Sequence, residues 1–144
     1  LGVAVGHGQE RGMPTWVACV AHVVVDVASG QVALKKLWQT IDVGTVVNPD
    51  GAMAQAEGAA LWGVSLALHE GARFDAGEVA EQNLDRYTPL RMRDVPELDI
   101  SFVDSQEFPS GLGEPPLIPV APAIGNAVFA ATGQRVRGLP IRLT

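Results

Sequence analysis

The feature that most constrains the fold of this chain is a long apolar extended segment that turns back on itself. Residues 16–27 are rich in β-branched side chains, Ala28-Ser29-Gly30 is a turn signal, and residues 31–41 resume an extended pattern. These segments predict an antiparallel hairpin. Because its first arm is nearly all apolar, the pattern also predicts burial on both faces of a larger sheet.

A helix is predicted soon after this hairpin, over residues 51–70, where apolar side chains recur at helical spacing. Asn48 or Asp50 can cap its start, and Pro49 suits its first turn. The segment is unusually dense in alanine and glycine. Since a glycine inside a helix costs roughly 1 kcal/mol relative to alanine, these small residues predict close packing against another backbone or a bulky ligand.

The second half of the chain predicts fewer regular elements. Residues 74–79 resemble a short hairpin turn, residues 98–103 alternate as in a strand, and residues 121–131 form a helical pattern that Gly133 ends. This order of elements predicts the α+β class, with two main helices packed on a mostly antiparallel sheet. The length of 144 residues suits one domain.

Composition excludes several classes of function. Sixteen acidic against ten basic residues give a net charge of −6 without a basic cluster, so we expect no nucleic-acid partner and no anionic membrane partner. The apolar runs are short or interrupted, which predicts no membrane-spanning segment. Cys19 is the only cysteine and lies in an apolar run, so an internal disulfide and a thiolate iron–sulfur cluster are excluded, and a buried inert thiol is expected.

No metal ligand set is predicted from the side chains of this chain. His7, His22 and His69 are far apart and lack the spacing of zinc ligands. The opening residues Leu1-Gly2-Val3-Ala4-Val5 read like the inside of a longer sequence, and we expect the chain to be a fragment.

One carboxylate stands out as a candidate for chemistry. Glu114 lies between Gly111-Leu112-Gly113 and Pro115-Pro116, directly before the second predicted helix. Glycine permits a close approach of the backbone to a ligand, and proline restricts the backbone, so an ordered loop is predicted. In such a loop Glu114 can act as a positioned general base, although a solvated glutamate in a surface turn fits the same pattern.

Four segments of the chain carry a further signal through their order and spacing: residues 41–49, 55–58, 113–117 and 123–133. Together they resemble the C-terminal part of the molybdenum-binding subunit of the xanthine dehydrogenase and aldehyde oxidase family. The likeness is greatest to the β-subunit type of isoquinoline 1-oxidoreductase and covers nearly the whole of residues 1–144.

This resemblance implies a cofactor, a reaction and site residues. The cofactor is a molybdenum ion on a pterin, either molybdopterin or its cytosine dinucleotide, and the reaction hydroxylates an aromatic N-heterocycle or an aldehyde with oxygen from water. Glu114 matches the family's catalytic base, and Gln55 and Gly113 match positions beside the cofactor. A glutamine on the surface of a helix, without a cofactor role, fits Gln55 equally well. The resemblance further implies that the remainder of the molybdenum subunit and an iron–sulfur electron-transfer subunit are partners.

Two alternatives remain open at this point. The chain can be a non-catalytic binding or assembly module of the same fold, in which Glu114 is only a loop residue. An acidic hydrolase would need a second carboxylate near Glu114, for which Glu107 is the nearest candidate and Asp104 ends a strand. The cellular compartment, cytoplasm or periplasm, is left undecided by the sequence.

Overall fold

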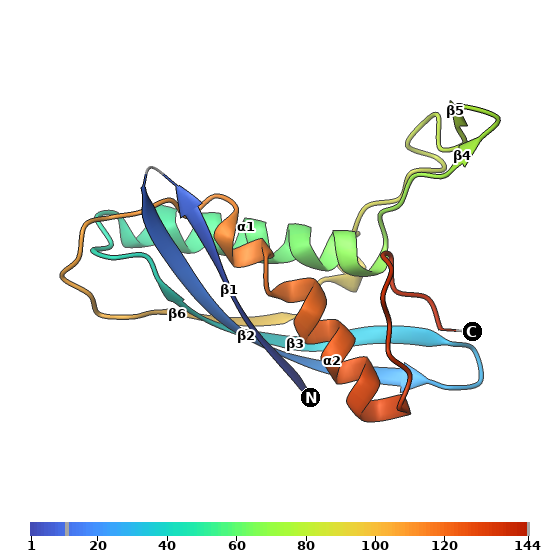
Figure 1. Ribbon diagram of the computed structural model, residues 1–144, viewed down its shortest axis with the longest axis horizontal. Helices are drawn as coiled ribbons and strands as arrows, with labels where there is room; N and C mark the ends of the chain where they lie inside the picture. Colours follow the sequence, from blue (N-terminus) through green and yellow to red (C-terminus); the bar gives the residue numbers. More distant parts are fainter. Residues whose placement is uncertain (11, 144) are drawn as a thin grey trace.

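Four strands form one sheet, in the order β1-β2-β3-β6, and two helices cover one of its faces (Figure 1). The computed structural model describes residues 1–10 and 12–143. The strands of the sheet are β1 (Gly2–Glu10), β2 (Met13–Asp26), β3 (Gln31–Asp42) and β6 (Glu97–Phe102), and the helices are α1 (Pro49–Leu68) and α2 (Val120–Thr132). The shorter elements are the hairpin β4 (Phe74–Asp75) and β5 (Glu78–Val79) and the 3-10 turns η1 (Met92–Asp94) and η2 (Pro115–Leu117).

The sheet is antiparallel except at one edge. β1 pairs with β2 and β2 with β3 in antiparallel register, whereas β6 runs parallel to β3. The connection from β3 to β6 contains α1, because two parallel strands need a long crossover. The predicted α+β class and the hairpin of β2 and β3 are therefore confirmed.

The expectation that the first arm of this hairpin is buried on both faces is wrong for this chain. Residues of β2 alternate between buried and exposed, with Val17, Cys19 and Ala21 inward and Trp16 and Val24 about half exposed. Both helices lie on the inward face, so nothing in the described part of the chain covers the other face. Because several outward-facing residues are apolar too, the sequence does not show the alternation between buried and exposed positions.

β1 is a strand that the sequence analysis did not predict. Its inward positions include Gly6 and Gly8, which face the segment around η2. A Cβ atom added at Gly6 would lie 2.9 Å from Ile118 Cγ2, and one at Gly8 would lie 2.9 Å from Pro115 Cγ. The absence of these two side chains lets η2 pack directly on the sheet.

The ends of both helices follow the predicted chemistry. Asn48 is the N-cap of α1, and its side-chain oxygen accepts from Gly51 N at 3.2 Å. Pro49 occupies the first helical position. Gly133 closes α2 in the left-handed region, with φ of 74°.

The core fills the space between the helices and the sheet. Its main cluster joins inward residues of β2 and β3 to one side of each helix, including Cys19, Leu37, Val64, Ile124 and Val128. By length and composition alone, Pro115–Thr132 is apolar enough to cross a membrane, but 44% of it is buried inside the chain. Because α2 packs against β1 and β2, this stretch is a core helix here.

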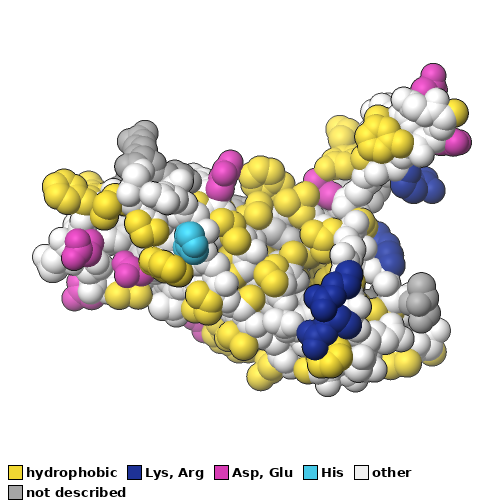
Figure 2. Space-filling view, viewed as in Figure 1, with side chains coloured by type: hydrophobic (Ala, Val, Ile, Leu, Met, Phe, Trp, Pro, Cys, Tyr) yellow, Lys and Arg dark blue, Asp and Glu magenta, His cyan; other side chains and the backbone are white. Residues whose placement is uncertain are grey.

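A narrow arm that carries β4 and β5 projects from the body of the molecule (Figure 1). Glu81 stabilises the base of the hairpin by accepting from Arg73 Nε at 2.7 Å. Tyr87 donates a hydrogen bond to Glu70, where the arm leaves α1. Figure 2 shows that acidic and hydrophobic side chains share the tip of the arm.

Candidate functional site

Glu114 lies in a tight turn between a glycine-containing loop and α2. It directly precedes η2, its φ and ψ are −113° and −32°, and its side chain is exposed. Pro115 and Pro116 are buried. Leu117 N donates to the carbonyl of Glu114 at 3.0 Å, and Ile118 N donates to that of Pro115 at 3.1 Å. The backbone around Glu114 is therefore fixed, while its carboxylate faces outward.

The chain before Glu114 is held by β2 and by the end of β3. Thr15 is fully buried in β2, and its hydroxyl donates to the carbonyl of Gly111 at 2.5 Å. The same hydroxyl lies 2.6 Å from Ser110 Oγ. Ser110 N donates to the carbonyl of Val43 at 2.9 Å. These contacts fix the loop three residues before Glu114.

The chain after Glu114 is held by β3 and by α1. Gln39 Nε2 donates to the carbonyl of Pro116 at 2.6 Å, inside the protein. A Cβ atom added at Gly63 of α1 would lie 3.0 Å from Leu117 O, so helix and turn approach closely there. This close approach confirms the packing predicted from the small residues of the helix.

Gln55 and Gly113, the two predicted cofactor-binding residues, are neighbours in space. Gln55 lies on the exposed side of α1. A Cβ atom added at Gly113 would lie 3.7 Å from Gln55 Nε2. Because Gly113 is bonded to Glu114, the structure brings the three predicted site residues together, although α1 and the loop are distant in sequence.

Thr15 and Gln39 were missed by the sequence analysis. Both are polar residues at inward positions of strands, since Thr15 shares its face with Val17 and Gln39 shares its face with Leu37 and Ile41. The signal that could have identified them is a polar residue at a position where the alternation of the strand predicts a buried apolar one. Such a side chain needs an internal hydrogen-bond partner, and both residues find one in the Glu114 loop.

Other reactive side chains do not form a second centre in the described residues. No group of three His, Cys, Asp or Glu side chains that could hold a metal ion occurs within 1–10 and 12–143. The Cys19 thiol is buried, as predicted, and this burial raises its pKa to about 12, which disfavours the reactive thiolate. Glu107 is exposed, and its carbonyl accepts from Thr45 N at 2.9 Å.

A cavity of about 320 Å³ lies away from this site, between α2 and the C-terminal segment. Its lining includes Pro122, Asn126 and Arg135, but neither Glu114 nor Gln55. Figure 2 shows basic side chains gathered beside the C-terminal end of α2. There Arg135 Cζ lies 3.6 Å from the centre of the Phe129 ring, so the guanidinium makes a cation–π contact within the chain.

Comparison with known proteins gives a family match and several related oxidoreductases, whose names carry two different cofactors. The family described as molybdopterin cofactor-binding domain matches residues 3–96. The chain is 55% identical over 142 residues to a Gluconacetobacter polyoxogenes protein named membrane-bound aldehyde dehydrogenase [pyrroloquinoline-quinone], covering 99% of this chain and 18% of that protein. It is 33% identical over 141 residues to isoquinoline 1-oxidoreductase subunit beta of Brevundimonas diminuta, covering 98% and 18%.

A solved structure shows the same fold. The aldehyde oxidoreductase from Desulfovibrio gigas aligns with a TM-score of 0.75 and 32% identity, over 88% of this chain and 14% of that one. The chain thus spans about a fifth or less of the length of these relatives.

Proposed function

This chain belongs to the family of molybdopterin cofactor-binding domains, and we propose that it supplies the catalytic base and one wall of the cofactor pocket in a molybdenum hydroxylase. It would form the C-terminal part of the cofactor-binding domain of a longer subunit. The observation that carries this proposal is the exposed Glu114 carboxylate on a loop held from both sides, next to Gln55 and Gly113.

The geometry around Glu114 suits a general base. Such a base must come within hydrogen-bond reach of its proton, about 2.6–3.2 Å between heavy atoms. Gly113 places no side chain directly before the carboxylate, and the buried Pro115 and Pro116 fix the chain after it. Glu114 can therefore accept a proton from a group presented to the loop without rearranging its backbone, which lowers the cost of orientation.

The neighbouring residues fit a polar organic cofactor. The Gln55 amide has both donors and acceptors, as the oxo and pterin groups require. Beside it, the backbone at Gly113 carries no side chain, and an added Cβ would meet only Gln55 Nε2, at 3.7 Å. When bound, the cofactor supplies the two-electron redox chemistry. The role of this chain is to hold one side of the cofactor and to move the proton.

We propose an aldehyde or an aromatic N-heterocycle as the substrate. The names of the relatives support both classes, since they include aldehyde dehydrogenase, isoquinoline 1-oxidoreductase and nicotinate dehydrogenase. The other partners would be the remainder of the molybdenum subunit and a subunit with iron–sulfur clusters that removes the electrons. The lone, buried Cys19 of this chain cannot ligate such a cluster.

The test of the base is Glu114→Gln in the complete enzyme, because glutamine keeps the size of the side chain and removes its basicity. We expect kcat for hydroxylation to fall by roughly 10²- to 10⁴-fold, with molybdenum and pterin content unchanged. Glu107→Gln is the control in the same loop and should retain the parental rate. This control also tests the hydrolase alternative, in which Glu107 would be the second carboxylate. A parental rate in the Glu114 variant would refute the proposal.

The cofactor itself is tested by analysis of the purified complex. We expect molybdenum and pterin in amounts close to one per subunit. Pyrroloquinoline quinone in their place would favour the cofactor in the name of the Gluconacetobacter relative. An intact complex without any of these groups would favour the non-catalytic module.

A further inference from the structure

Gln39 connects the inward face of the sheet to the loop of Glu114. It is a buried residue of β3, 2% exposed, and lies between the inward residues Leu37 and Ile41. Its Nε2 donates to the carbonyl of Pro116 at 2.6 Å. We propose that Gln39 is a positioning residue, which holds the Glu114 carboxylate where it can act as the base. This inference rests on the proposed function.

The carbonyl of Pro116 needs a donor from outside its own turn. In a 3-10 turn this carbonyl would accept from the residue three positions further along the chain. That residue is Pro119, which has no N–H. Pro116 is buried, and a buried carbonyl without a partner is costly. Gln39 supplies the donor that the sequence of the turn removes.

The other half of the Gln39 amide supports a role beyond stability. Within the described chain its Oε1 is buried and no N–H or O–H group donates to it, although the amide also interacts with the Cys19 thiol of the neighbouring strand β2, a weak hydrogen-bond partner. An unpaired buried acceptor costs on the order of 1–3 kcal/mol. The amide cannot turn over to relieve this cost, because the Pro116 carbonyl must face its N–H group. An apolar side chain of similar length would avoid the cost, but it would leave the turn without an anchor.

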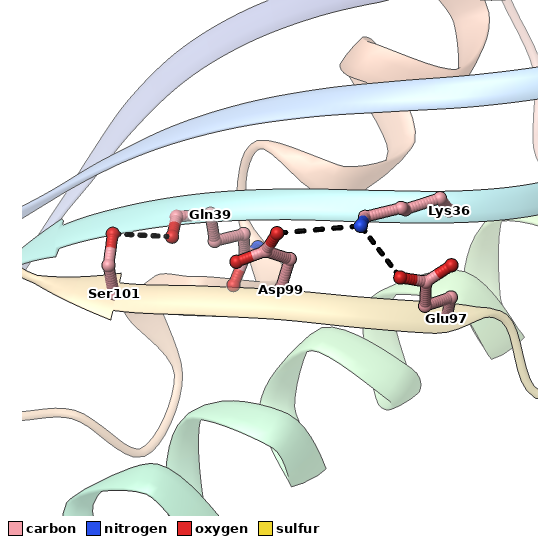
Figure 3. A network of polar contacts seen from close by, with 5 residues as sticks. All are labelled: Lys36, Gln39, Glu97, Asp99 and Ser101. Carbon is pink, nitrogen blue, oxygen red and sulfur yellow. Dashed lines mark hydrogen bonds and ion pairs between the residues drawn. The ribbon is translucent and has the colours of Figure 1, made fainter.

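The anchor is rigid at both of its ends. Figure 3 shows Gln39 on β3 beside β6, where Ser101 Oγ donates to the Gln39 carbonyl at 3.4 Å. Lys36 further joins the two strands through Glu97 at 2.7 Å and Asp99 at 3.4 Å.

At the other end, two proline rings fix φ between the hydrogen-bonded carbonyl and Glu114. A displacement of Pro116 is therefore transmitted to the carboxylate. Misplacement of a catalytic group by about 1 Å can lower a rate by about 10²-fold.

The experiment uses Gln39→Met in the complete, cofactor-loaded enzyme. Methionine keeps the length of the side chain, removes the donor and also removes the unpaired oxygen. We expect kcat to fall roughly ten- to hundredfold, while KM, molybdenum content and thermal stability stay near parental values. The control is Ser65→Ala, which removes the buried hydroxyl that accepts from Leu90 N at 2.8 Å, away from the loop. It should lower stability and leave kcat unchanged.

A double variant separates positioning from a general loss of order. If Gln39 acts through Glu114, adding Gln39→Met to Glu114→Gln lowers the remaining rate by no more than about twofold. An equal loss in both backgrounds, or a parental kcat for Gln39→Met, would overturn the positioning role and leave the proposed base intact. A parental rate for Glu114→Gln alone would instead refute the proposed function.

Gln39→Glu gives a second readout that does not depend on the methionine variant folding. A buried carboxyl keeps its proton to higher pH than a solvated one, and the protonated form can donate to Pro116. We expect kcat of this variant to be closest to parental at low pH and to fall as the carboxyl ionises. A profile that runs parallel to the parental one would contradict the inference.

Discussion

Substitution of two glycines of α1, one in close contact with the η2 region and one in open space, measures how tightly the helix packs there. A Cβ atom added at Gly63 would lie 2.8 Å from Val120 Cβ and 3.0 Å from Leu117 O, whereas one added at Gly58 would meet nothing within 4 Å. Alanine is favoured over glycine in a helix interior by about 1 kcal/mol at either position. Gly58→Ala should therefore raise the free energy of unfolding by about 1 kcal/mol.

At Gly63 the same gain in propensity is opposed by overpacking. Forcing extra atoms into a filled interior costs typically 1–3 kcal/mol. The neighbours here are a Cβ atom and a backbone carbonyl, which cannot move aside as the end of a flexible side chain can. Gly63→Ala should therefore change stability by between about 0 and −2 kcal/mol. Since propensity cancels between the two variants, their difference of about 1–3 kcal/mol measures the contact of α1 with η2 and with Val120, the first residue of α2.

Urea unfolding followed by tryptophan fluorescence measures this difference, and circular dichroism on heating provides a second measure. For a chain of this length, 1 kcal/mol corresponds to a shift in Tm of roughly 3 °C. The two variants should then differ by roughly 3–9 °C. Equal stabilisation by both substitutions would show that α1 and η2 are not in close contact. The Glu114 loop would then lack the support described from α1, whereas the hydrogen bonds from Thr15 and Gln39 would stand.

Three further outcomes are expected. Asn48→Ala removes the N-cap of α1 and should lower the free energy of unfolding by about 1 kcal/mol in urea. Thr15→Val removes the buried donor to Gly111 and should cost about 1–3 kcal/mol, whereas Thr40→Val, at an exposed position of β3, should cost less than half of that. The folded pKa of Cys19 is about 12 and the ordinary value is 9.0, so the unfolded chain releases this proton first as pH rises. The contribution of the buried thiol to the free energy of unfolding is therefore complete below about pH 9 and is lost as the pH rises toward 12. Relative to Cys19→Ala, the parent should lose about 1.4 kcal/mol of stability per pH unit in that range. Parallel curves of stability against pH for the two proteins would contradict this assignment.

Local chemistry in the sequence predicted the elements whose ends depend on neighbouring residues. The cap at Asn48, the stop at Gly133 and the turn around Glu114 all follow from residues within a few positions of each other. The features that were missed depend on distant partners. β1 becomes a strand because β2 offers it a pairing edge, and its glycines have meaning only once η2 lies against them. No local pattern contains that information.

The same reasoning explains why the candidate site was predicted in part. Glu114 carried a local signature, but the residues that hold its loop come from β2 and β3. An isolated turn of this sequence would pay the full conformational entropy of its glycines, and its prolines alone cannot choose where the carboxylate points. In the folded chain, Thr15 and Gln39 fix the backbone on either side of Glu114, and neither reaches the carboxylate itself in the hydrogen bonds described. The sheet thus fixes the position of the Glu114 backbone, while the carboxylate itself is free to meet a group on the exposed side of the loop. Under the proposed function, substitutions of Thr15 or Gln39 beneath the loop should therefore lower the rate by moving the Glu114 carboxylate, without altering the carboxylate chemically.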